Sequence, residues 1–142
     1  MSEKSTRVGG QSCRLYIQKL QLFHNSGSNH RHPKGSTLWS EWATYADGTP
    51  SLYVVYSYGR HWPLYINWNG VWFSNTDKYS RTTTKHASQT HPLTQCVPLS
   101  KIDMEYLVLF GRPQPDILVK AAQLKLLSDD LISEVTKARI AA

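Results

Sequence analysis

The sequence has few of the features that mark secreted, membrane-spanning or zinc-binding proteins. Cysteine occurs twice among 142 residues, at Cys13 and Cys96, without a C-x-x-C pair. A reduced, cytosolic protein is therefore expected, and a single long-range disulfide stays open as the alternative. No stretch approaches the roughly 18 apolar residues of a spanning helix. The first twelve residues contain no apolar segment, and we expect neither secretion nor membrane insertion.

Acidic residues are scarce in the first two thirds of the chain. Residues 1–91 contain ten Lys and Arg against four Asp and Glu, together with all six His, whereas residues 92–142 contain six residues of each sign. The formal excess of +6 therefore lies upstream of residue 92. A localised basic excess favours an acidic partner such as nucleic acid, because neutralised phosphates release counterions. The alternative that the charge only promotes solubility stays open.

Composition predicts a folded chain with a single domain. Hydrophobic residues make up 40% and aromatic residues 11% of the sequence, well above the level of disordered proteins. We expect a flexible N-terminal arm over residues 1–12 and one α+β domain over residues 13–142. Residues 14–23 fit a strand or a short helix, and we favour the strand. Residues 24–36 are rich in Gly, Ser and Asn and predict a loop.

The middle of the chain has the composition of antiparallel strands. Aromatic and β-branched residues before Asp47-Gly48, and again over 51–58, predict strands. Residues 64–68 and 71–75 flank Asn69-Gly70, which favours a type I′ hairpin turn. Residues 14–75 are thus predicted to be mostly strands, forming an antiparallel meander of about four to five strands. Alternation along 51–68 predicts one apolar sheet face and one open face that carries Tyr, Trp and polar groups.

The C-terminal third predicts helices over residues 100–140 that cover the apolar face. Ser100 is a candidate N-cap and Gly111 a stop signal. Pro115 marks the first turn of a second helix, and a further segment follows Ser128. The expected apolar face of the first helix consists of Ile102, Met104, Tyr106, Leu109 and Phe110.

Residues 76–92 form a polar segment between the strands and these helices. Asn75, Thr76 and Asp77 follow a strand, where such side chains commonly hold turns. Ser80 or Thr82 is a candidate cap for a short helix, on which Arg81 and Lys85 share one face. A helix start with cations and hydroxyls favours anion binding, and the alternative is a polar cap on the edge of the sheet.

Part of this region resembles a family of small bacteriophage-encoded proteins of unknown function. The family pattern is Y-S-Y-G-x-H-[FW]-P, then W-x-x-N, then K-Y-S-x-T-T-S-K-H-x-S, and the resemblance covers residues 52–92. The chain departs from the pattern at Thr84 and Ala87. The resemblance implies a phage origin, and hence the cytoplasm of an infected host cell, without a reaction. The matching positions are Tyr56, Ser57, Tyr58, Gly59, His61, Trp62, Pro63, Trp72, Asn75, Lys78, Tyr79, Ser80, Thr82, Thr83, Lys85, His86 and Ser88.

These patterns favour a binding protein that engages nucleic acid or a nucleotide through residues 57–91. Cations would contact phosphate, aromatic rings would stack on bases, and hydroxyls would donate hydrogen bonds. A protein that inhibits a host defence system or host enzyme is the alternative partner class. A homo-oligomer formed through the C-terminal helices is also open. The predicted binding residues are Tyr58, Arg60, His61, Trp62, Lys78, Tyr79, Ser80, Arg81, Thr82, Thr83, Lys85 and His86.

Catalysis is the weaker hypothesis. His61, His86 and Tyr79 are the candidates for acid–base chemistry on a phosphodiester. The region lacks the paired carboxylates that a magnesium-dependent nuclease needs. His24, His30 and His32 are of a metal-ligating type, but no Cys or Glu accompanies them. We therefore predict neither a metal site nor a cofactor.

Overall fold

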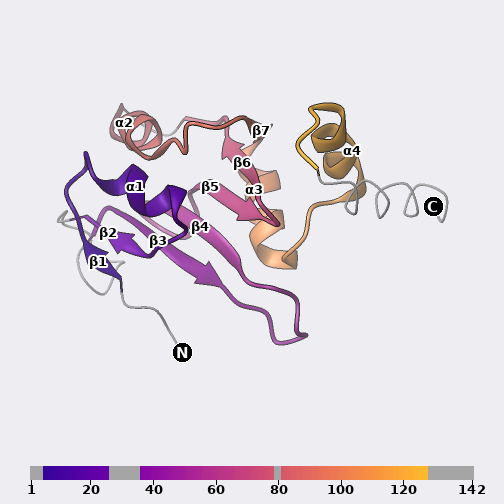
Figure 1. Ribbon diagram of the computed structural model, residues 1–142, viewed down its shortest axis with the longest axis horizontal. Helices are drawn as coiled ribbons and strands as arrows, with labels where there is room; N and C mark the ends of the chain where they lie inside the picture. Colours follow the sequence, from indigo (N-terminus) through magenta and orange to yellow (C-terminus); the bar gives the residue numbers. More distant parts are fainter. Residues whose placement is uncertain (1–4, 26–35, 79–80, 128–142) are drawn as a thin grey trace.

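A mixed β-sheet forms the centre of the protein. The computed structural model describes residues 5–25, 36–78 and 81–127, and within them seven strands lie side by side in sequence order (Figure 1). Strands β2 to β6 are antiparallel, whereas β1 runs parallel to β2 and β7 runs parallel to β6. The strands are β1 (Thr6–Arg7), β2 (Phe23–His24), β3 (Leu38–Ala43), β4 (Leu52–Ser57), β5 (Pro63–Trp68), β6 (Val71–Asn75) and β7 (Cys96–Leu99).

Four helices accompany the sheet in the described residues. They are α1 (Cys13–Gln18), α2 (Arg81–Thr90), α3 (Lys101–Phe110) and α4 (Pro115–Gln123). The α+β class agrees with the prediction, but the sheet is mixed and has more strands than the expected four to five. Parallel neighbours need a crossover connection, and α1 and α2 provide it at the two edges. No helix in the described part of the chain is long and apolar enough to span a membrane.

The N-terminal region differs from the sequence prediction in two places. Residues 14–18 belong to α1, so the favoured strand over 14–23 is wrong and only Phe23–His24 is extended. Cys13 and Ile17, four residues apart, are the buried positions of this helix, which is helical spacing. The expected arm over 1–12 is also wrong for Thr6–Arg7, whose pairing with β2 forms the edge of the sheet.

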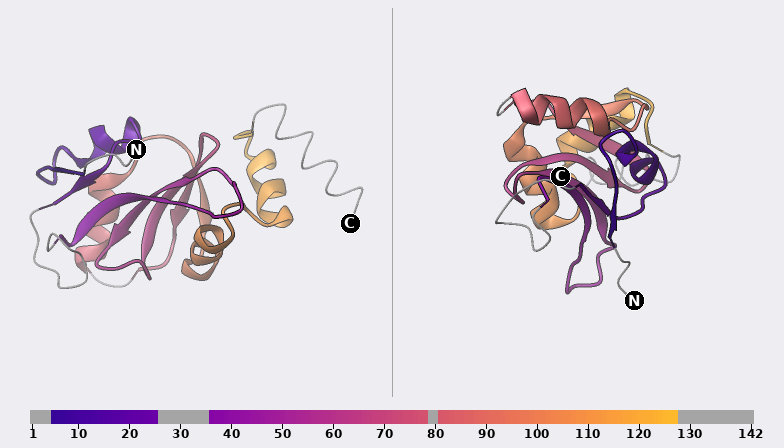
Figure 2. Two further views of the ribbon diagram at one scale, coloured as in Figure 1. Left: turned by 90° about the horizontal axis from the view of Figure 1, so that it is seen from below. Right: turned by 90° about the vertical axis from the view of Figure 1, so that its left-hand side faces the viewer.

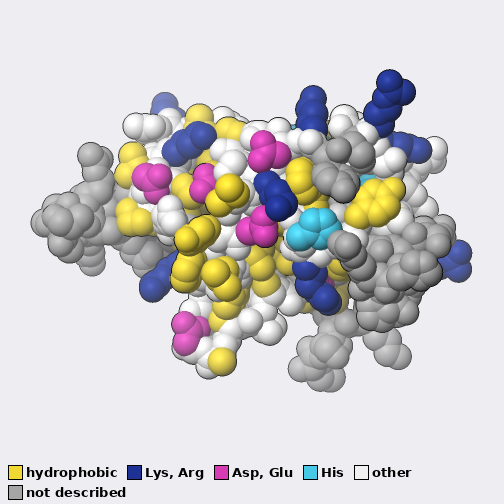
Figure 3. Space-filling model, turned by 180° about the vertical axis from the view of Figure 1, so that it is seen from behind, with side chains coloured by type: hydrophobic (Ala, Val, Ile, Leu, Met, Phe, Trp, Pro, Cys, Tyr) yellow, Lys and Arg dark blue, Asp and Glu magenta, His cyan; other side chains and the backbone are white. Residues whose placement is uncertain are grey.

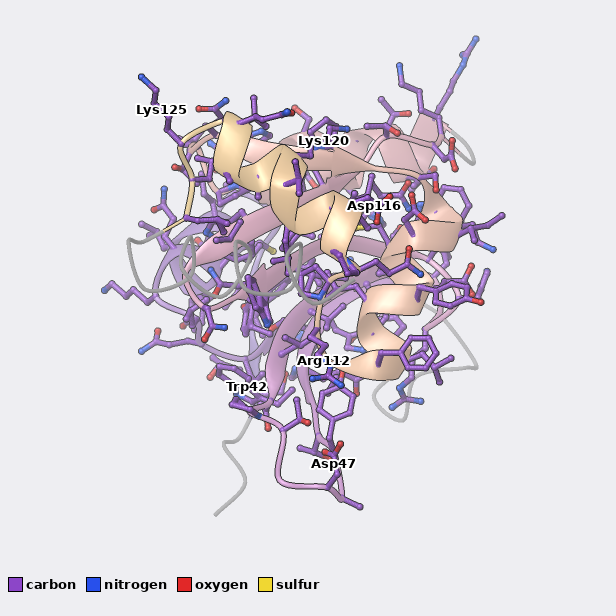
Figure 4. The ribbon with its side chains drawn as sticks, turned by 90° about the vertical axis from the view of Figure 1, so that its right-hand side faces the viewer. Trp42, Asp47, Arg112, Asp116, Lys120 and Lys125 are labelled. Carbon is purple, nitrogen blue, oxygen red and sulfur yellow. The ribbon has the colours of Figure 1, made fainter. Side chains whose placement is uncertain are left out.

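The predicted hairpin turn at Asn69-Gly70 is confirmed, and a second hairpin turn lies at Asp47-Gly48, where the sequence predicted only the end of a strand. Asn69 and Gly70 have φ values of 49° and 81°, and they join β5 to β6. Asp47 lies at the tip of the β3–β4 hairpin (Figure 4), where its carboxylate accepts a hydrogen bond from the Thr49 N–H at 3.0 Å. Alternation along β4 is confirmed as well, because Val54 and Val55 belong to different core clusters on the two sheet faces.

Helices cover both faces of the sheet (Figure 2). The first core cluster packs α3 and α4 on one face, and the second packs α1 and an edge of α2 on the other. The expected open face of Tyr and Trp is therefore wrong. Tyr53, Tyr65 and Trp72 are at most 8% exposed. This cover is hard to predict from the sequence, because α1 is short and α2 contains almost no apolar residue.

Helix α3 has the predicted ends but a different orientation. The Ser100 hydroxyl accepts from the Asp103 N–H at 3.2 Å, and Gly111 ends the helix with φ 78°. Only Met104 and Leu107 are buried. Four members of the predicted core face are exposed instead, because the helix is apolar on two sides and only one can meet the sheet. They are Ile102, Tyr106, Leu109 and Phe110.

Helix α4 begins at Pro115 as predicted, and it buries Ile117 and Ala121. The helical segment expected after Ser128 lies outside the described residues.

Candidate anion-binding site on helix α2

Asn75, Thr76 and Asp77 fix the chain between β6 and α2. The Asn75 side-chain amide donates to the Pro63 carbonyl at 2.9 Å, and the Thr76 N–H donates to the Leu99 carbonyl at 2.9 Å. The Asp77 carboxylate accepts from the Lys101 N–H at the start of α3, also at 2.9 Å. These groups therefore hold a turn, as predicted, and tie it to β7 and α3.

The inner side of α2 is polar and buried. Thr83, His86 and Thr90 face inward, and the Thr90 hydroxyl donates to the His86 carbonyl at 2.7 Å. His86 Nδ1 and the Ser57 hydroxyl share a buried hydrogen bond of 2.8 Å. Buried polar groups are tolerated where they are hydrogen-bonded, so α2 can pack on the sheet without an apolar stripe.

Tyr58 and His86 stack at the end of β4. Their ring centroids are 5.6 Å apart and their planes differ by 30°. Tyr58 has a φ of 65°, a left-handed conformation that bulky residues seldom adopt. Burial, and to a smaller extent the charge of Lys85, lowers the pKa of His86. The neutral imidazole is therefore favoured, and its contacts position α2.

The C-terminal end of α2 is held by α1 and β5. The Arg14 guanidinium donates to the carbonyls of Ser88 and His91, both at 2.8 Å. A cation is favourable at this negative end of the helix dipole. The Tyr65 hydroxyl donates to the Ala87 carbonyl at 2.6 Å. Helix α2 is therefore held at its middle and at its C-terminal end, which leaves its outer side available for a ligand.

The outer side of α2 carries cations. Arg81 and Lys85 are exposed and one helical turn apart, and Lys78 is exposed just upstream. In the described residues, neither α2 nor Lys78 has a carboxylate within ion-pair distance, and the ion pairs are Arg60–Glu41 and Lys101–Glu105. Basic side chains project from the end of the molecule where α2 lies (Figure 3). This outer side is thus an uncompensated positive surface.

An open pocket of about 270 Å³ lies beside these cations. Its apolar wall comes partly from Leu64, which packs in the same cluster as Tyr65 because the β4–β5 register shifts after Val55. The pocket presents one cation, three threonines and the carboxylate-bearing Asp77 next to this apolar wall, so an anionic group would have to sit on the Lys78 side. The lining residues are Leu64, Asn75, Thr76, Asp77, Lys78, Thr83, Thr84 and Ala87.

The structure groups some of the predicted binding residues and separates others. Lys78, Arg81, Thr82, Thr83 and Lys85 lie together on the pocket and the outer side of α2. Sequence reasoning assigned only Lys78 and Thr83 of the pocket lining to the site, and the turn-forming sequence at 75–77 was the one available signal for the rest. The lining residues that it missed are Leu64, Asn75, Thr76, Asp77, Thr84 and Ala87. Tyr79 and Ser80 lie outside the described residues.

The remaining predicted residues have other roles or places. Arg60 makes a bidentate ion pair with Glu41, at 2.6 and 3.1 Å, on the α3 face of the sheet. Trp62 is 7% exposed, with the Lys101 ammonium 5.7 Å from its ring centroid. Because Trp62 is buried and Tyr58 already stacks on His86, these two predicted stacking residues do not present free ring faces to bases.

The groups considered for catalysis are not arranged as an acid–base pair. His61 is exposed on the turn after β4, whereas His86 is buried and engaged by Ser57. The cysteines Cys13 and Cys96 are free thiols, and burial raises the pKa of each to about 11. Such thiols are weak nucleophiles at neutral pH. No cluster of three metal-ligating side chains occurs in the described ranges, and His30 and His32 lie outside them.

No family model, curated protein or solved structure matches this chain. The resemblance to phage proteins therefore stays a prediction, and the function has to be argued from the geometry of the chain itself.

Proposed function

We propose that this protein is a binding protein, not an enzyme, and that it holds the phosphate backbone of nucleic acid on the outer side of α2. The observation that carries the proposal is the group of three exposed cations, Lys78, Arg81 and Lys85, without a carboxylate partner among the described residues. A phage origin and a site of action in the cytoplasm of the infected host belong to the same proposal.

The positions of the cations on α2 are electrostatically unfavourable for the helix itself. Arg81 lies at the N-terminal end of α2, where the helix dipole carries about half a positive charge. No acidic residue occupies the first turn. Like charges four residues apart, such as Arg81 and Lys85, destabilise a helix by about 0.2–0.5 kcal/mol. A bound anion relieves both repulsions, which supports a role in binding over a role in folding.

Phosphate contact is favoured over base stacking. Trp62 is buried, and the stacking surface of Tyr58 is used by His86. Lys78 lines, together with Asp77, Thr83 and Thr84, a pocket beside α2 whose Lys78 side can receive one phosphate. Contacts of this kind bind many sequences with similar affinity. We therefore expect little sequence preference.

The test is fluorescence polarisation with labelled single- and double-stranded oligonucleotides at several salt concentrations. The Arg81→Gln/Lys85→Gln double variant should weaken binding and lower the slope of log Kd against log salt by about 2. Lys120→Gln/Lys125→Gln is the matched control, because it removes the same charge from the region of α4 (Figure 4).

Binding that does not depend on salt, or an equal loss in both double variants, would exclude α2 as the phosphate site. In that case a protein partner becomes the leading hypothesis, and its test is co-purification from host lysate with loss on replacement of the same α2 cations.

A further inference from the structure

Helix α3 exposes a continuous apolar face, with side-chain exposures of 66% for Ile102, 44% for Tyr106, 68% for Leu109 and 54% for Phe110. Ile102, Tyr106 and Phe110 follow one another at spacings of four, and Leu109 comes three residues after Tyr106, so these side chains share one side of the helix. Hydrophobic side chains gather over α3 in the middle of this face of the molecule (Figure 3). Tyr106 and Phe110 pack on each other, with ring centroids 5.3 Å apart.

A groove of about 390 Å³ continues this face toward β3. Leu109 forms one wall, and Trp42, Tyr45 and Tyr56 contribute aromatic surface. The Tyr45 hydroxyl donates to the Val108 carbonyl, which joins the hairpin to α3. The Arg60–Glu41 ion pair lies on the rim. An apolar centre with a polar rim is the usual arrangement of a protein interface.

We propose that this face is the interface of a homodimer, in which α3 packs antiparallel on α3 of a second copy. The two-fold axis would cross the helix near Tyr106, the middle of the exposed face. Such an interface is isologous, so the same surface is used on both copies. Ile102 at one end of the face then meets the partner's Phe110 at the other, and the apolar side chains cover each other.

Charges beside the face favour a second copy as the occupant. Asp103 is near the start of α3 and Arg112 follows its end, and both line one small cavity next to Tyr106. They therefore lie on the same flank of the helix, at opposite ends. Arg112 occupies the connection between α3 and α4 (Figure 4). Neither residue belongs to an ion pair within the described ranges, and Arg112 lies near the Asp47 carboxylate, whose pKa is lowered mainly by its hydrogen bonds with Thr49 and to a small extent by the Arg112 charge.

The two-fold axis is perpendicular to α3, so the partner helix runs in the opposite direction. The flank that carries Asp103 and Arg112 lies beside the same flank of the partner. The axis therefore brings Asp103 opposite the partner's Arg112, and it does so twice in each dimer. The same operation places the negative end of one helix dipole beside the positive end of the other. The charges on this face of one copy are complementary to the charges on the same face of a second copy. We therefore propose a second copy, and not an unrelated protein, as the partner.

The experiment is sedimentation equilibrium of the full chain over a wide concentration range. Dimer formation is expected for the unchanged protein, and Leu109→Asp should raise the dimer Kd by about 100-fold or more, since it places a charge in the centre of each half of the interface. Leu15→Asp is the matched control, because Leu15 is an exposed leucine on another helix, 59% exposed, and it should leave the dimer unchanged.

Charge reversal tests the two-fold arrangement itself. Asp103→Arg and Arg112→Asp should each weaken the dimer by about ten-fold or more, and the double variant should recover most of that loss. A monomer at every concentration would overturn the proposal and leave α3 to another partner. So would a dimer that survives Leu109→Asp, or a double variant that is weaker than either single variant.

Discussion

Helices α2 and α3 are both ten residues long and both lie against the sheet, yet α2 buries polar side chains and α3 exposes apolar ones. The polar helix α2 buries Thr83, His86 and Thr90. The apolar helix α3 buries only Met104 and Leu107, and it exposes four large hydrophobic residues. Average hydrophobicity would assign the deeper burial to α3 and a solvated position to α2.

The difference teaches that the neighbours of a helix decide what it buries. Helix α2 meets hydrogen-bonding groups such as the Ser57 hydroxyl, so polar side chains can face inward at little cost. Helix α3 is apolar on two sides but has a sheet on only one of them. Each helix therefore exposes the side chains that the sheet cannot accommodate. These are cations on α2 and hydrophobic side chains on α3. We propose that these exposed side chains bind partners: phosphate on α2 and a second copy of the chain on α3.

The largest change in stability is expected when a substitution on the buried side of α3 is compared with one on its exposed side. Leu107→Ala should lower the free energy of unfolding by about 2–5 kcal/mol, because it leaves a cavity in the core between α3 and the sheet. Leu109→Ala, two positions along the same helix, should change it by no more than about 0.5 kcal/mol. Urea denaturation followed by circular dichroism, at protein concentrations too low for association, measures both. Equal losses would show that both sides of α3 are core.

A smaller effect is expected on the inner side of α2. His86→Ala should cost about 1–3 kcal/mol, because it leaves the buried Ser57 hydroxyl without its partner and removes the ring stacked on Tyr58. Ser88→Ala, on the outer side of the same helix, is the control and should stay within about 0.5 kcal/mol. The same denaturation measurement applies. If the two variants are equally stable, the buried contacts of His86 do not contribute to holding α2 on the sheet.

The smallest effect is a dependence of stability on pH. The folded-state pKa of His86 is lowered, mainly by burial, so the unfolded chain binds its proton first as the pH falls. The stability linked to neutral His86 is complete above the usual histidine pKa of about 6.5 and is lost as the pH falls through the lower folded value. Unfolding measured between pH 7 and pH 5 should therefore show a flatter loss for His86→Gln. The control variant Ser88→Ala, which removes no titratable group from α2, should retain the slope of the unchanged protein, and a slope shared by all three proteins would exclude His86 as its source.

Local signals predicted the elements that depend on local chemistry. The type I′ turn at Asn69-Gly70, the Ser100 cap and the Gly111 stop of α3, and a helix carrying Arg81 and Lys85 all occur as expected. Each rests on contacts within a few residues of the chain, which the sequence contains in full. Alternation along β4 belongs to the same class, since side chains of a strand must alternate.

The missed features depend on distant parts of the chain. The strand β7 pairs with β6 over Cys96–Leu99, a segment whose Pro98 argues against a strand except at an edge. Helix α1 covers a sheet face that composition left open, and it also holds α2 through Arg14. The pocket beside Lys78 needs Leu64 from β5, which no motif connects to the 75–91 segment.

The sequence by itself determined the α+β class, the Asn69-Gly70 hairpin, both ends of α3, the start of α4 and the presence of a basic polar segment, because these follow from neighbouring residues. Tertiary structure alone decided which side of each helix faces the sheet. That choice separated the buried His86 from the exposed Arg81 and Lys85, and the buried Leu107 from the exposed Leu109. The physical reason is that burial is a property of packed surfaces, and a helix with two possible inner sides is oriented only by the sheet it meets.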